Sequence, residues 1–533
     1  MSRILIYDTT LRDGSQAEGI SYSLSDKIKI AQKLDIFGVD YIEGGWPASN
    51  PKDTEFFKQA ANINWQNAKI AAFGSTCKAG LAPSDDANLR ALVECGAPVA
   101  CIVGKSWDFH VVKALGTTLE ENLRMIEESV RFLKEAGLEV IFDAEHFFDG
   151  HKNNPNYALQ TIKAAQRGGA DVITLCDTNG GCLPGEITEI ITSIKKWIEV
   201  PLGIHAHNDG ELAVANSLVA IDAGVTMVQG TFNGYGERCG NANLCSIIPN
   251  IELKTKYHCK AGQSLKHLTE TAFYISEVSN TRLSKNQPFV GSGAFAHKGG
   301  IHVSAIMKSP ETYEHLPPDK VGNKRRVLVS ELAGTSNLVE KARELNVTLD
   351  PKSKKTKELI KKIKELEYEG YQFEGAEASL ELFLRKNLGD YIDHFKLEIF
   401  KVNTEKRGTS EFSSEAIIKI RVDDKVVHTA AEGEGPVHAM DNALRKALTE
   451  FFPVLSNMYL EDYKVRVLEE SKATQAKVRV LITSRDQESM WSTVGVSTNI
   501  IEASWQALIE SMDYALLKEK KKRELQSVAQ GGE

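Results

Sequence analysis

The sequence predicts an α/β fold in which a (β/α)8 barrel is followed by a mainly helical region and a C-terminal α+β domain with an internal repeat. Three observations lead to this prediction. Short apolar runs alternate with longer amphipathic ones through roughly the first 250 residues, which is the size of such a barrel. From about residue 392 the pattern becomes rich in strands. Within that part, residues 428–448 align with residues 492–512.

Eight apolar runs are the predicted strands of the barrel, and helical patterns lie between them. The runs cover residues 3–8, 39–45, 69–74, 98–104, 138–145, 171–177, 201–207 and 226–232. Eight parallel strands with intervening helices is the count of a closed barrel. A doubly wound open sheet is the alternative, but the dinucleotide-binding pattern GxGxxG does not follow the first strand. We therefore expect the barrel.

Two of the intervening helices have clear ends in the sequence. In "SDKIKIAQKLDIFG" (25–38), Ser25 is the expected N-cap of a helix whose apolar residues recur at helical spacing. In "TLEENLRMIEESVRFLKEAG" (118–137), Gly137 is the expected stop. Both helices lie between predicted strands, as the alternation of a barrel requires.

Changes in composition and hydrophobic pattern divide the chain into four parts. We expect the barrel at 1–261, helical linker subdomains at 262–391, the C-terminal domain at 392–518 and a frayed polar tail at 519–533. In the repeat, the two copies share identical residues at the pairs Thr429/Thr493, Ala439/Ala503, Ala443/Ala507 and Leu444/Leu508. Each copy predicts a few strands and one helix, and two such units commonly pack into one pseudo-symmetric domain.

Composition and charge exclude several classes of protein. The formal net charge of −8 gives no basic surface for nucleic acid or for an anionic membrane. No apolar stretch reaches the roughly 18 residues of a membrane helix. The first residues enter a strand pattern at once, so we expect no secretory signal. The eight cysteines are scattered without a CxxC pair, which is typical of reduced thiols in a cytoplasmic protein.

Polar residues gather at the carboxyl ends of the predicted strands, where barrel enzymes carry their catalytic groups. The set is Arg12, Asp13, Glu43, Glu145, Asp177, Thr178, Asn179, His205, His207, Glu237, Arg238 and Asn241. Because these ends meet at one edge of a barrel, the sequence predicts a polar site there.

The stretch "GIHAHNDGEL" (203–212) gives that site its chemistry. His205 and His207 are two residues apart in a strand, so both side chains point to the same face. Asp13 is the natural partner carboxylate, because closure of the ring brings the loop after the first strand near the seventh. Two imidazoles and one carboxylate predict a divalent metal site. The alternative is a hydrogen-bonded pair of core histidines, which the polar motifs at the neighbouring strand ends disfavour.

Several motifs resemble a known family. "LRDGSQ", "HAHND" and "GERCGNANL" resemble the acyl-CoA-dependent Claisen-condensing metalloenzymes, namely the 2-isopropylmalate, homocitrate and citramalate synthases. The R-D and H-x-H elements alone are shared with a wider barrel superfamily of lyases and carboxyl-transferring domains. The stretches 295–305 and 313–337 are similar to the segment that follows the barrel in the condensing branch. "IEGGWPASNPKD" (42–53) most resembles the citramalate synthase type, and the C-terminal repeat resembles the LeuA-type regulatory domain of these synthases.

The resemblance implies an activity and a metal. It implies condensation of acetyl-CoA with pyruvate and water to (R)-citramalate and CoA, a reaction of isoleucine biosynthesis. It makes Asp13, His205, His207 and Asn241 the ligands of a divalent ion, for which Mg, Mn and Zn remain alternatives. It further implies a homodimer, with isoleucine as the feedback effector of the C-terminal domain.

The resemblance also implies roles for residues that contact the substrates. Arg12 would stabilise the alkoxide, Thr178 would donate to the substrate carboxylate, and Glu43 would orient Arg12. The candidates for proton transfer are Glu145, His302 and Tyr313. His302 and Tyr313 follow the barrel, so we expect them to reach the active site from the next subdomain, of this chain or of a partner chain.

Other functions remain open at this point. Condensation onto a larger 2-oxo acid would give 2-isopropylmalate or homocitrate. A metal-dependent aldolase or lyase would cleave the carbon bond instead, but "GGIHVSA" and the C-terminal repeat argue against it. A barrel that only senses a small molecule would not need Arg12, Asp13 and both histidines together.

Overall fold

The computed structural model describes residues 2–47, 49–391, 393–406, 408, 412–468 and 475–530. The chain separates into two compact units, and each is described by itself. The first unit comprises Met1–Phe295 and Leu316–Arg325. The second comprises Ala296–His315 and Arg326–Glu533.

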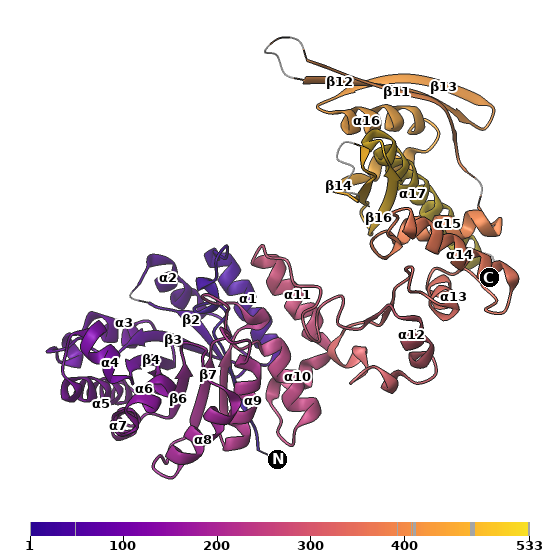
Figure 1. Ribbon diagram of the computed structural model, residues 1–533. Helices are drawn as coiled ribbons and strands as arrows, with labels where there is room; N and C mark the ends of the chain where they lie inside the picture. Colours follow the sequence, from indigo (N-terminus) through magenta and orange to yellow (C-terminus); the bar gives the residue numbers. More distant parts are fainter. Residues whose placement is uncertain are drawn as a thin grey trace. The chain divides into compact units, whose positions relative to one another are not determined.

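The first unit is a closed parallel barrel of eight strands, surrounded by helices (Figure 1). In order, the strands are β1 (Leu5–Asp8), β2 (Tyr41–Gly45), β3 (Lys69–Ser75), β4 (Val99–Lys105), β5 (Glu139–Glu145), β6 (Val172–Asp177), β7 (Leu202–Ala206) and β8 (Met227–Gly230). Strands β1 and β8 pair in parallel register from Leu5 with Met227 to Asp8 with Gly230, which closes the ring. The predicted barrel is confirmed, and the open sheet is excluded.

Helices cover the outside of this barrel. They are α1 (Leu24–Phe37), α2 (Pro51–Ala60), α3 (Ala87–Glu94), α4 (Asp108–His110), α5 (Leu119–Glu135), α6 (Phe147–Asn153), α7 (Pro155–Gly168), α8 (Pro184–Lys195), α9 (Ala213–Ala223), α10 (Leu244–Lys254) and α11 (Leu268–Val278). The expected cap of α1 was wrong. Its N-cap is Ser23, whose hydroxyl accepts from the backbone N–H of Asp26 while the Asp26 carboxylate accepts from the Ser23 backbone, whereas Ser25 lies inside the helix.

Alternation along each strand separates two apolar cores. Ile6 faces the helices, whereas the next residue, Tyr7, belongs to the cluster inside the barrel. That inner cluster is small and contains Tyr7, Tyr41, Ala71, Phe73, Val99, Cys101, Ile141, Val172 and Met227. Since successive residues point to opposite faces, the inward positions beyond this layer are the ones that carry side chains into the mouth of the barrel.

The second unit begins with short elements and helices. These are β9 (Ala296–His297), α12 (Gly300–Ile306), β10 (Arg326–Val327), α13 (Thr335–Glu344), α14 (Lys354–Tyr368) and α15 (Glu377–Leu388). The region predicted as helical, 262–391, is mainly helical, but its first helix α11 belongs to the barrel unit. The division of the chain by contacts thus falls after Phe295, beyond the expected boundary at residue 261.

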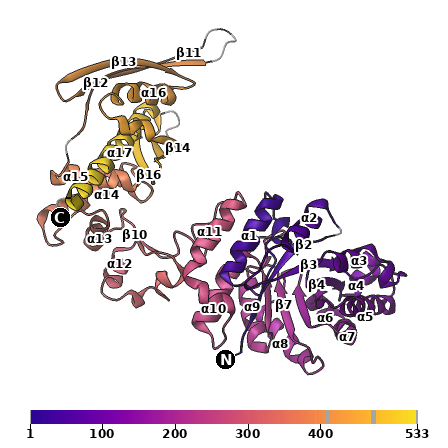
Figure 2. The same cartoon turned by 180° about the vertical axis from the view of Figure 1, so that it is seen from behind.

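Two three-stranded antiparallel sheets, each followed by a helix, complete the second unit. The first consists of β11 (Lys396–Lys406), β12 (Phe412–Val422) and β13 (Lys425–Gly433), and its helix α16 (Pro436–Leu448) packs on β12 and β13 (Figure 2). The second consists of β14 (Tyr459–Val467), β15 (Val478–Arg485) and β16 (Met490–Ser497), with α17 (Ile500–Gln530). Helix α17 runs through most of the segment expected as a polar tail.

The internal repeat is confirmed by equivalent hydrogen bonds in the two copies. Thr429 on β13 donates from its hydroxyl to the carbonyl of Ala443 in α16 at 3.4 Å. Thr493 on β16 donates in the same way to Ala507 in α17 at 2.7 Å. The aligned pairs Ala439/Ala503 and Leu444/Leu508 are buried in both copies. The identities seen in the sequence therefore mark the contact of a helix with the third strand of its sheet.

Within the described part of the chain, every helix is too short or too polar to cross a membrane.

Candidate active site

A cavity of about 580 Å³ opens at the carboxyl ends of the barrel strands. Eight residues that the sequence places at strand ends line it, namely Arg12, Asp13, Glu145, Thr178, His205, His207, Glu237 and Arg238. Two others are engaged elsewhere. Asp177 accepts from the backbone N–H groups of Gly181 and Cys182, each at 3.3 Å, and Asn179 donates to Asp149 at 3.0 Å.

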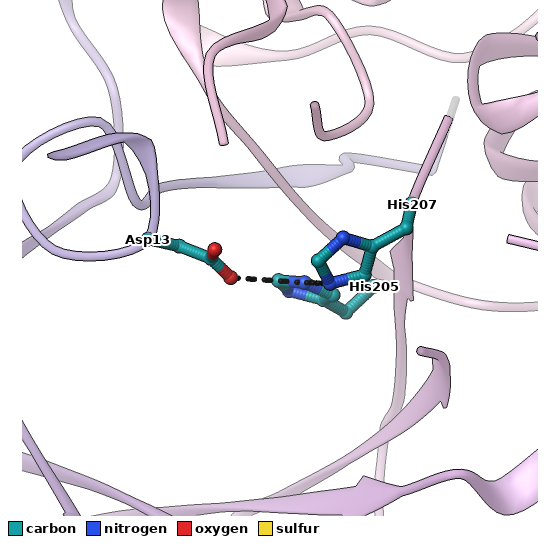
Figure 3. A group of neighbouring side chains, drawn as sticks. All are labelled: Asp13, His205 and His207. Atoms are coloured by element: carbon teal, nitrogen blue, oxygen red, sulfur yellow. Dashed lines mark hydrogen bonds and ion pairs between the residues drawn. The ribbon is translucent and has the colours of Figure 1, made fainter. Parts of the chain in front are cut away.

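Asp13, His205 and His207 form one compact group in this cavity, and their ligand atoms all lie within 4.8 Å of one another. The carboxylate and the two imidazoles point toward one another, from the loop after β1 and from the end of β7 (Figure 3). Asp13 Oδ2 lies 3.4 Å from His205 Nε2, and this nitrogen lies 3.3 Å from His207 Nε2. Three donor atoms that converge on one point suit a divalent cation.

The far side of the His205 ring fixes which nitrogen carries the proton. Its Nδ1 lies 2.8 Å from Gln229 Oε1, and Gln229 Nε2 donates to Asp143 Oδ1 at 2.8 Å and to Thr174 Oγ1 at 3.1 Å. Because both amide hydrogens of Gln229 are used, its oxygen is the acceptor and His205 Nδ1 is the donor. The Nε2 lone pair of His205 is thereby directed at the centre of the group, as metal ligation requires.

Asn241 lies beside His207, on the loop after β8. Its backbone forms a bridge with His207, and its Nδ2 donates to the carbonyl of Tyr235 at 3.1 Å. Asn241 Oδ1 and His207 Nδ1 are buried without a hydrogen-bond partner in the described part of the protein. A buried acceptor with no partner is costly unless something binds it. Gly236 permits this arrangement, because a Cβ there would lie 2.2 Å from Asn241 Nδ2.

The charges of this group shift the pKa values of its members in different directions. Burial opposes ionisation of Asp13, but Arg12 and His205 outweigh it and hold the pKa of the Asp13 carboxyl well below its usual range. Burial likewise opposes protonation of His205, yet the contact with Asp13 raises its pKa overall. Burial and the neighbouring His205 lower the pKa of His207 to about 4, so this ring is a neutral ligand near neutral pH.

Arg12 is fixed on three sides at the cavity wall. Its Nε donates to Glu43 Oε2 at 2.6 Å, and its Nη1 lies 3.4 Å from Asp13 Oδ2. Its guanidinium lies over the ring of Phe73, 3.8 Å from the centroid. Glu43 also accepts from the hydroxyl of Tyr7 at 2.9 Å and is fully buried on β2. Arg12 is therefore a rigid cation beside the metal-ligating group.

The opposite wall is formed by the ends of β4, β5 and β6. The Thr178 hydroxyl accepts from the backbone N–H of His146 at 2.9 Å, which leaves its hydrogen free to donate. Arg238 holds the loop after β8 in place, because it donates to Asp209 at 2.8 and 3.0 Å and to the carbonyl of Thr178 at 2.8 Å. Glu145 forms an ion pair with Lys105.

Three residues of this site were missed in the sequence. Lys105 was missed because the predicted fourth strand ended at Gly104, whereas β4 extends to Lys105. Gln229 and Asp143 lie inside apolar strands and belong to no motif. Strand alternation could have indicated them, because a polar residue two positions from an inward-facing residue of the same strand also faces the inside of the barrel.

His302 and Tyr313 belong to the second unit. His302 is in α12 and Tyr313 directly follows a short 3-10 turn. Their rings stack at 4.1 Å between centroids with 25° between planes, and both side chains are exposed. The structure thus brings these two candidates together on one surface of the second unit.

Three family models match the chain in succession. The HMGL-like model matches residues 3–275. The homocitrate synthase post-HMGL domain-like model matches residues 289–370, and the LeuA allosteric (dimerisation) domain matches residues 374–516. Together they cover the barrel, the helical segment and the domain with the internal repeat.

Curated relatives match over nearly the full length. The chain is 56% identical to the (R)-citramalate synthase of Aquifex aeolicus over 97% of this chain and 98% of that protein. It is 55% identical to the (R)-citramalate synthase of Geobacter sulfurreducens, with the same coverage. The 2-isopropylmalate synthase of Methanocaldococcus jannaschii is 32% identical over 97% of this chain and 96% of that protein. The chain therefore belongs to the HMGL-like family, among the (R)-citramalate and 2-isopropylmalate synthases that it matches from end to end.

Proposed function

We propose that this protein is an (R)-citramalate synthase, an acyltransferase that condenses acetyl-CoA with pyruvate and water to give (R)-citramalate and CoA. The observation that carries the proposal is the convergence of Asp13, His205 and His207 in the same cavity as Arg12 and Glu145. Five relatives at 45–56% identity are named (R)-citramalate synthase, which supports pyruvate as the acceptor.

Asp13, His205, His207 and Asn241 would hold the divalent ion of this reaction, with Mg, Mn and Zn as the alternatives. When bound, the ion supplies Lewis acidity to the keto group of the 2-oxo acid. The orphaned Oδ1 of Asn241 supports its place in the ligand set.

The remaining residues of the cavity bind and orient the acceptor. Arg12 faces the point where negative charge develops on the keto oxygen as the new carbon–carbon bond forms, and it stabilises that charge. Glu43 holds the guanidinium in this orientation through the 2.6 Å hydrogen bond. Thr178 donates its free hydroxyl hydrogen to the substrate carboxylate.

A base must take one proton from the acetyl methyl group, and water must then displace CoA from the thioester. Glu145 lines the cavity on the side opposite Arg12 and is one candidate for these proton transfers. His302 and Tyr313 are the others, since an imidazole is suited to proton transfer near neutral pH and the two rings act as one stacked pair. We propose that they enter the active site from the second unit of the same or of a partner chain.

The C-terminal domain has a proposed regulatory role. The match to the LeuA allosteric (dimerisation) domain supports a homodimer in which this domain binds a feedback effector. Isoleucine is the proposed effector, because citramalate is a precursor in isoleucine biosynthesis. We further propose that residues 1–261 are the catalytic barrel, 262–391 the linker subdomains that complete the active site, and 392–518 the regulatory domain.

The test is the profile of acceptors. Purified protein is incubated with acetyl-CoA, Mg or Mn and a panel of 2-oxo acids, and free CoA is followed with a thiol reagent. A pocket closed around one methyl group excludes larger side chains sterically, whereas a pocket made for a larger acid loses only about 1–3 kcal/mol per missing methylene. We expect good use of pyruvate, weak use of 2-oxobutyrate and almost none of 2-oxoisovalerate. A kcat/KM higher for 2-oxoisovalerate or 2-oxoglutarate would assign the enzyme to 2-isopropylmalate or homocitrate synthesis instead.

A further inference from the structure

We propose that Lys105 is a positioning residue of the reaction, which holds the Glu145 carboxylate in one orientation, directed into the barrel cavity. No sequence motif marks this lysine, and the inference rests on the proposed function, which it deepens. Lys105 does not itself transfer a proton in the reaction. It acts through Glu145 alone.

The topology of the barrel places the two side chains together. Strands β4 and β5 pair in parallel from Val99 with Glu139 to Lys105 with Glu145, so the last residues of both strands are direct neighbours. Residues two and four positions before Lys105, Val103 and Cys101, face inward, and Asp143 does so before Glu145. Lys105 and Glu145 therefore both project into the cavity that they line, and the Lys105 ammonium bonds Glu145 Oε2.

The backbone holds these strand ends firmly. The side chain of Asn122, fully buried on α5, donates to the carbonyl of Lys105 at 2.9 Å. The backbone N–H of Ser106 donates to the carbonyl of Glu145 at 3.0 Å. The exposed fractions of the Lys105 and Glu145 side chains are 25% and 23%, so water screens this ion pair less than a pair on the outer surface.

The two arginines of the cavity wall are already engaged. Arg12 is bonded to Glu43, and Arg238 is bonded to Asp209. Among the described residues, Lys105 is the cation that contacts Glu145. This pairing makes Lys105 the group that compensates the charge of Glu145.

The contact with Lys105 also restrains the Glu145 side chain. Without it, Glu145 would be free to take another rotamer, which would move the carboxylate away from the position that a base must hold.

The experiment compares kcat and KM of the full-length enzyme with acetyl-CoA and pyruvate. The variants are Lys105→Met, Lys105→Arg, Glu145→Gln and the double variant Lys105→Met/Glu145→Gln. Lys134→Met is the matched control, because Lys134 pairs with Asp171 at 2.7 Å on the outside of the barrel. Circular dichroism and thermal melting show whether each variant is folded.

For Lys105→Met we expect kcat to fall by about 10–100-fold. The loss should fall mainly on kcat and little on KM, because the pair positions a reacting group. Lys105→Arg should recover most of the loss, since it restores the ion pair, and Lys134→Met should leave kcat and KM unchanged. The double variant should be no slower than Glu145→Gln, because Lys105 acts through Glu145.

Two results would overturn the inference while leaving the proposed function intact. One is a kcat of Lys105→Met equal to that of an active wild type. The other is a double variant whose loss equals the product of the two single losses, which would give Lys105 an independent role. If Lys105→Met does not fold, the comparison of Lys105→Arg with Lys105→Gln decides by the same criteria. A wild type that releases no CoA with any 2-oxo acid would overturn the proposed function, and this inference with it.

Discussion

His205 owes its orientation to Gln229, a residue on β8 that no motif marks. The imidazole Nδ1 donates to Gln229 Oε1 at 2.8 Å, and Gln229 is itself held by Asp143 and Thr174. This chain of hydrogen bonds crosses the inside of the barrel and ends at the ligand atom His205 Nε2. At the scale of single residues, the geometry of the proposed metal site is therefore set by side chains that do not belong to it.

Replacing Gln229 should weaken metal binding without removing a ligand. In Gln229→Leu, His205 Nδ1 loses its acceptor and the ring is free to rotate or change tautomer. Loss of such an outer partner typically costs about 10–100-fold in metal affinity. Titration calorimetry with Mn²⁺ would measure the change, with His205→Ala as the lower limit. Gln166→Leu is the control, because Gln166 only accepts from the backbone of Glu199 at the surface. An unchanged Mn²⁺ affinity in Gln229→Leu would show that the network does not orient His205.

Metal affinity should also depend on pH in a way that one histidine determines. The pKa of His205 is raised, so a metal ion must displace a proton from this ring as the pH falls below that pKa. His207, with a pKa of about 4, and Asp13, with a low pKa, are already deprotonated there. We expect the apparent affinity for Mn²⁺ to fall about tenfold per pH unit on the acid side and to level off above the His205 pKa.

The proton count tests this assignment directly. Calorimetry in buffers with different ionisation enthalpies should show one proton released per ion on the acid side and none on the plateau. Two protons released would mean that His207 is also protonated before the metal binds.

The candidate site could be predicted from the sequence where its residues end strands and form short motifs. Asp13, His205 and His207 were predicted to meet in this way, because parallel strands must end at the same edge of a barrel. Lys105 and Gln229 were not found. Lys105 was missed because β4 is one residue longer than predicted. Gln229 was missed because hydrophobic periodicity does not show which side chains of two strands become neighbours inside the barrel.

At the scale of elements, the strands of the barrel were predictable to within two residues because each is a buried apolar run between polar turns. The start of α1 was not, because Ser23 and Ser25 are both plausible caps and only the capping box with Asp26 selects Ser23. The repeat in the second unit was predictable from a few identical residues because those residues make the same contact twice. The few residues that are identical in the two copies thus lie at the contact between the third strand and the helix.

The two copies of this contact should differ in strength. Thr493 donates to Ala507 over 2.7 Å and is fully buried, whereas the equivalent bond of Thr429 is 3.4 Å long and Thr429 is partly exposed. Replacing Thr by Val removes the bond and keeps the shape. We expect Thr493→Val to destabilise β16 and α17 locally by about 1 kcal/mol, and Thr429→Val to cost less in β13 and α16. Hydrogen exchange measured by mass spectrometry on peptides of these elements resolves the two sites. Equal protection factors in both variants would contradict this ranking.

At the scale of the whole molecule, helix α15 ties the linker segment to the domain with the repeat. Its Ser379 accepts from the backbone N–H of Val494 on β16 at 2.9 Å, and its Glu381 pairs with Lys521 of α17. Leu380 and Leu384 of the same helix pack in the core formed by α13 and α14. The sequence pattern assigned α15 to the linker alone, because composition does not show that one short helix packs against two apolar cores.

Removing the C-terminal domain should therefore abolish regulation and also weaken the rest of the second unit. In a chain that ends at residue 390, α15 loses the partners on β16 and α17 that bury one of its faces. We expect this truncated enzyme to melt at a lower temperature than the full-length enzyme and to be insensitive to isoleucine. The full-length enzyme should be inhibited by isoleucine more than by leucine at millimolar concentration. Inhibition is measured as the fractional loss of CoA release, so that a lower basal rate of the truncated enzyme does not obscure it. A full-length enzyme that ignores isoleucine would refute the effector, and a truncated enzyme that isoleucine still inhibits would place the effector site outside the domain that carries the repeat.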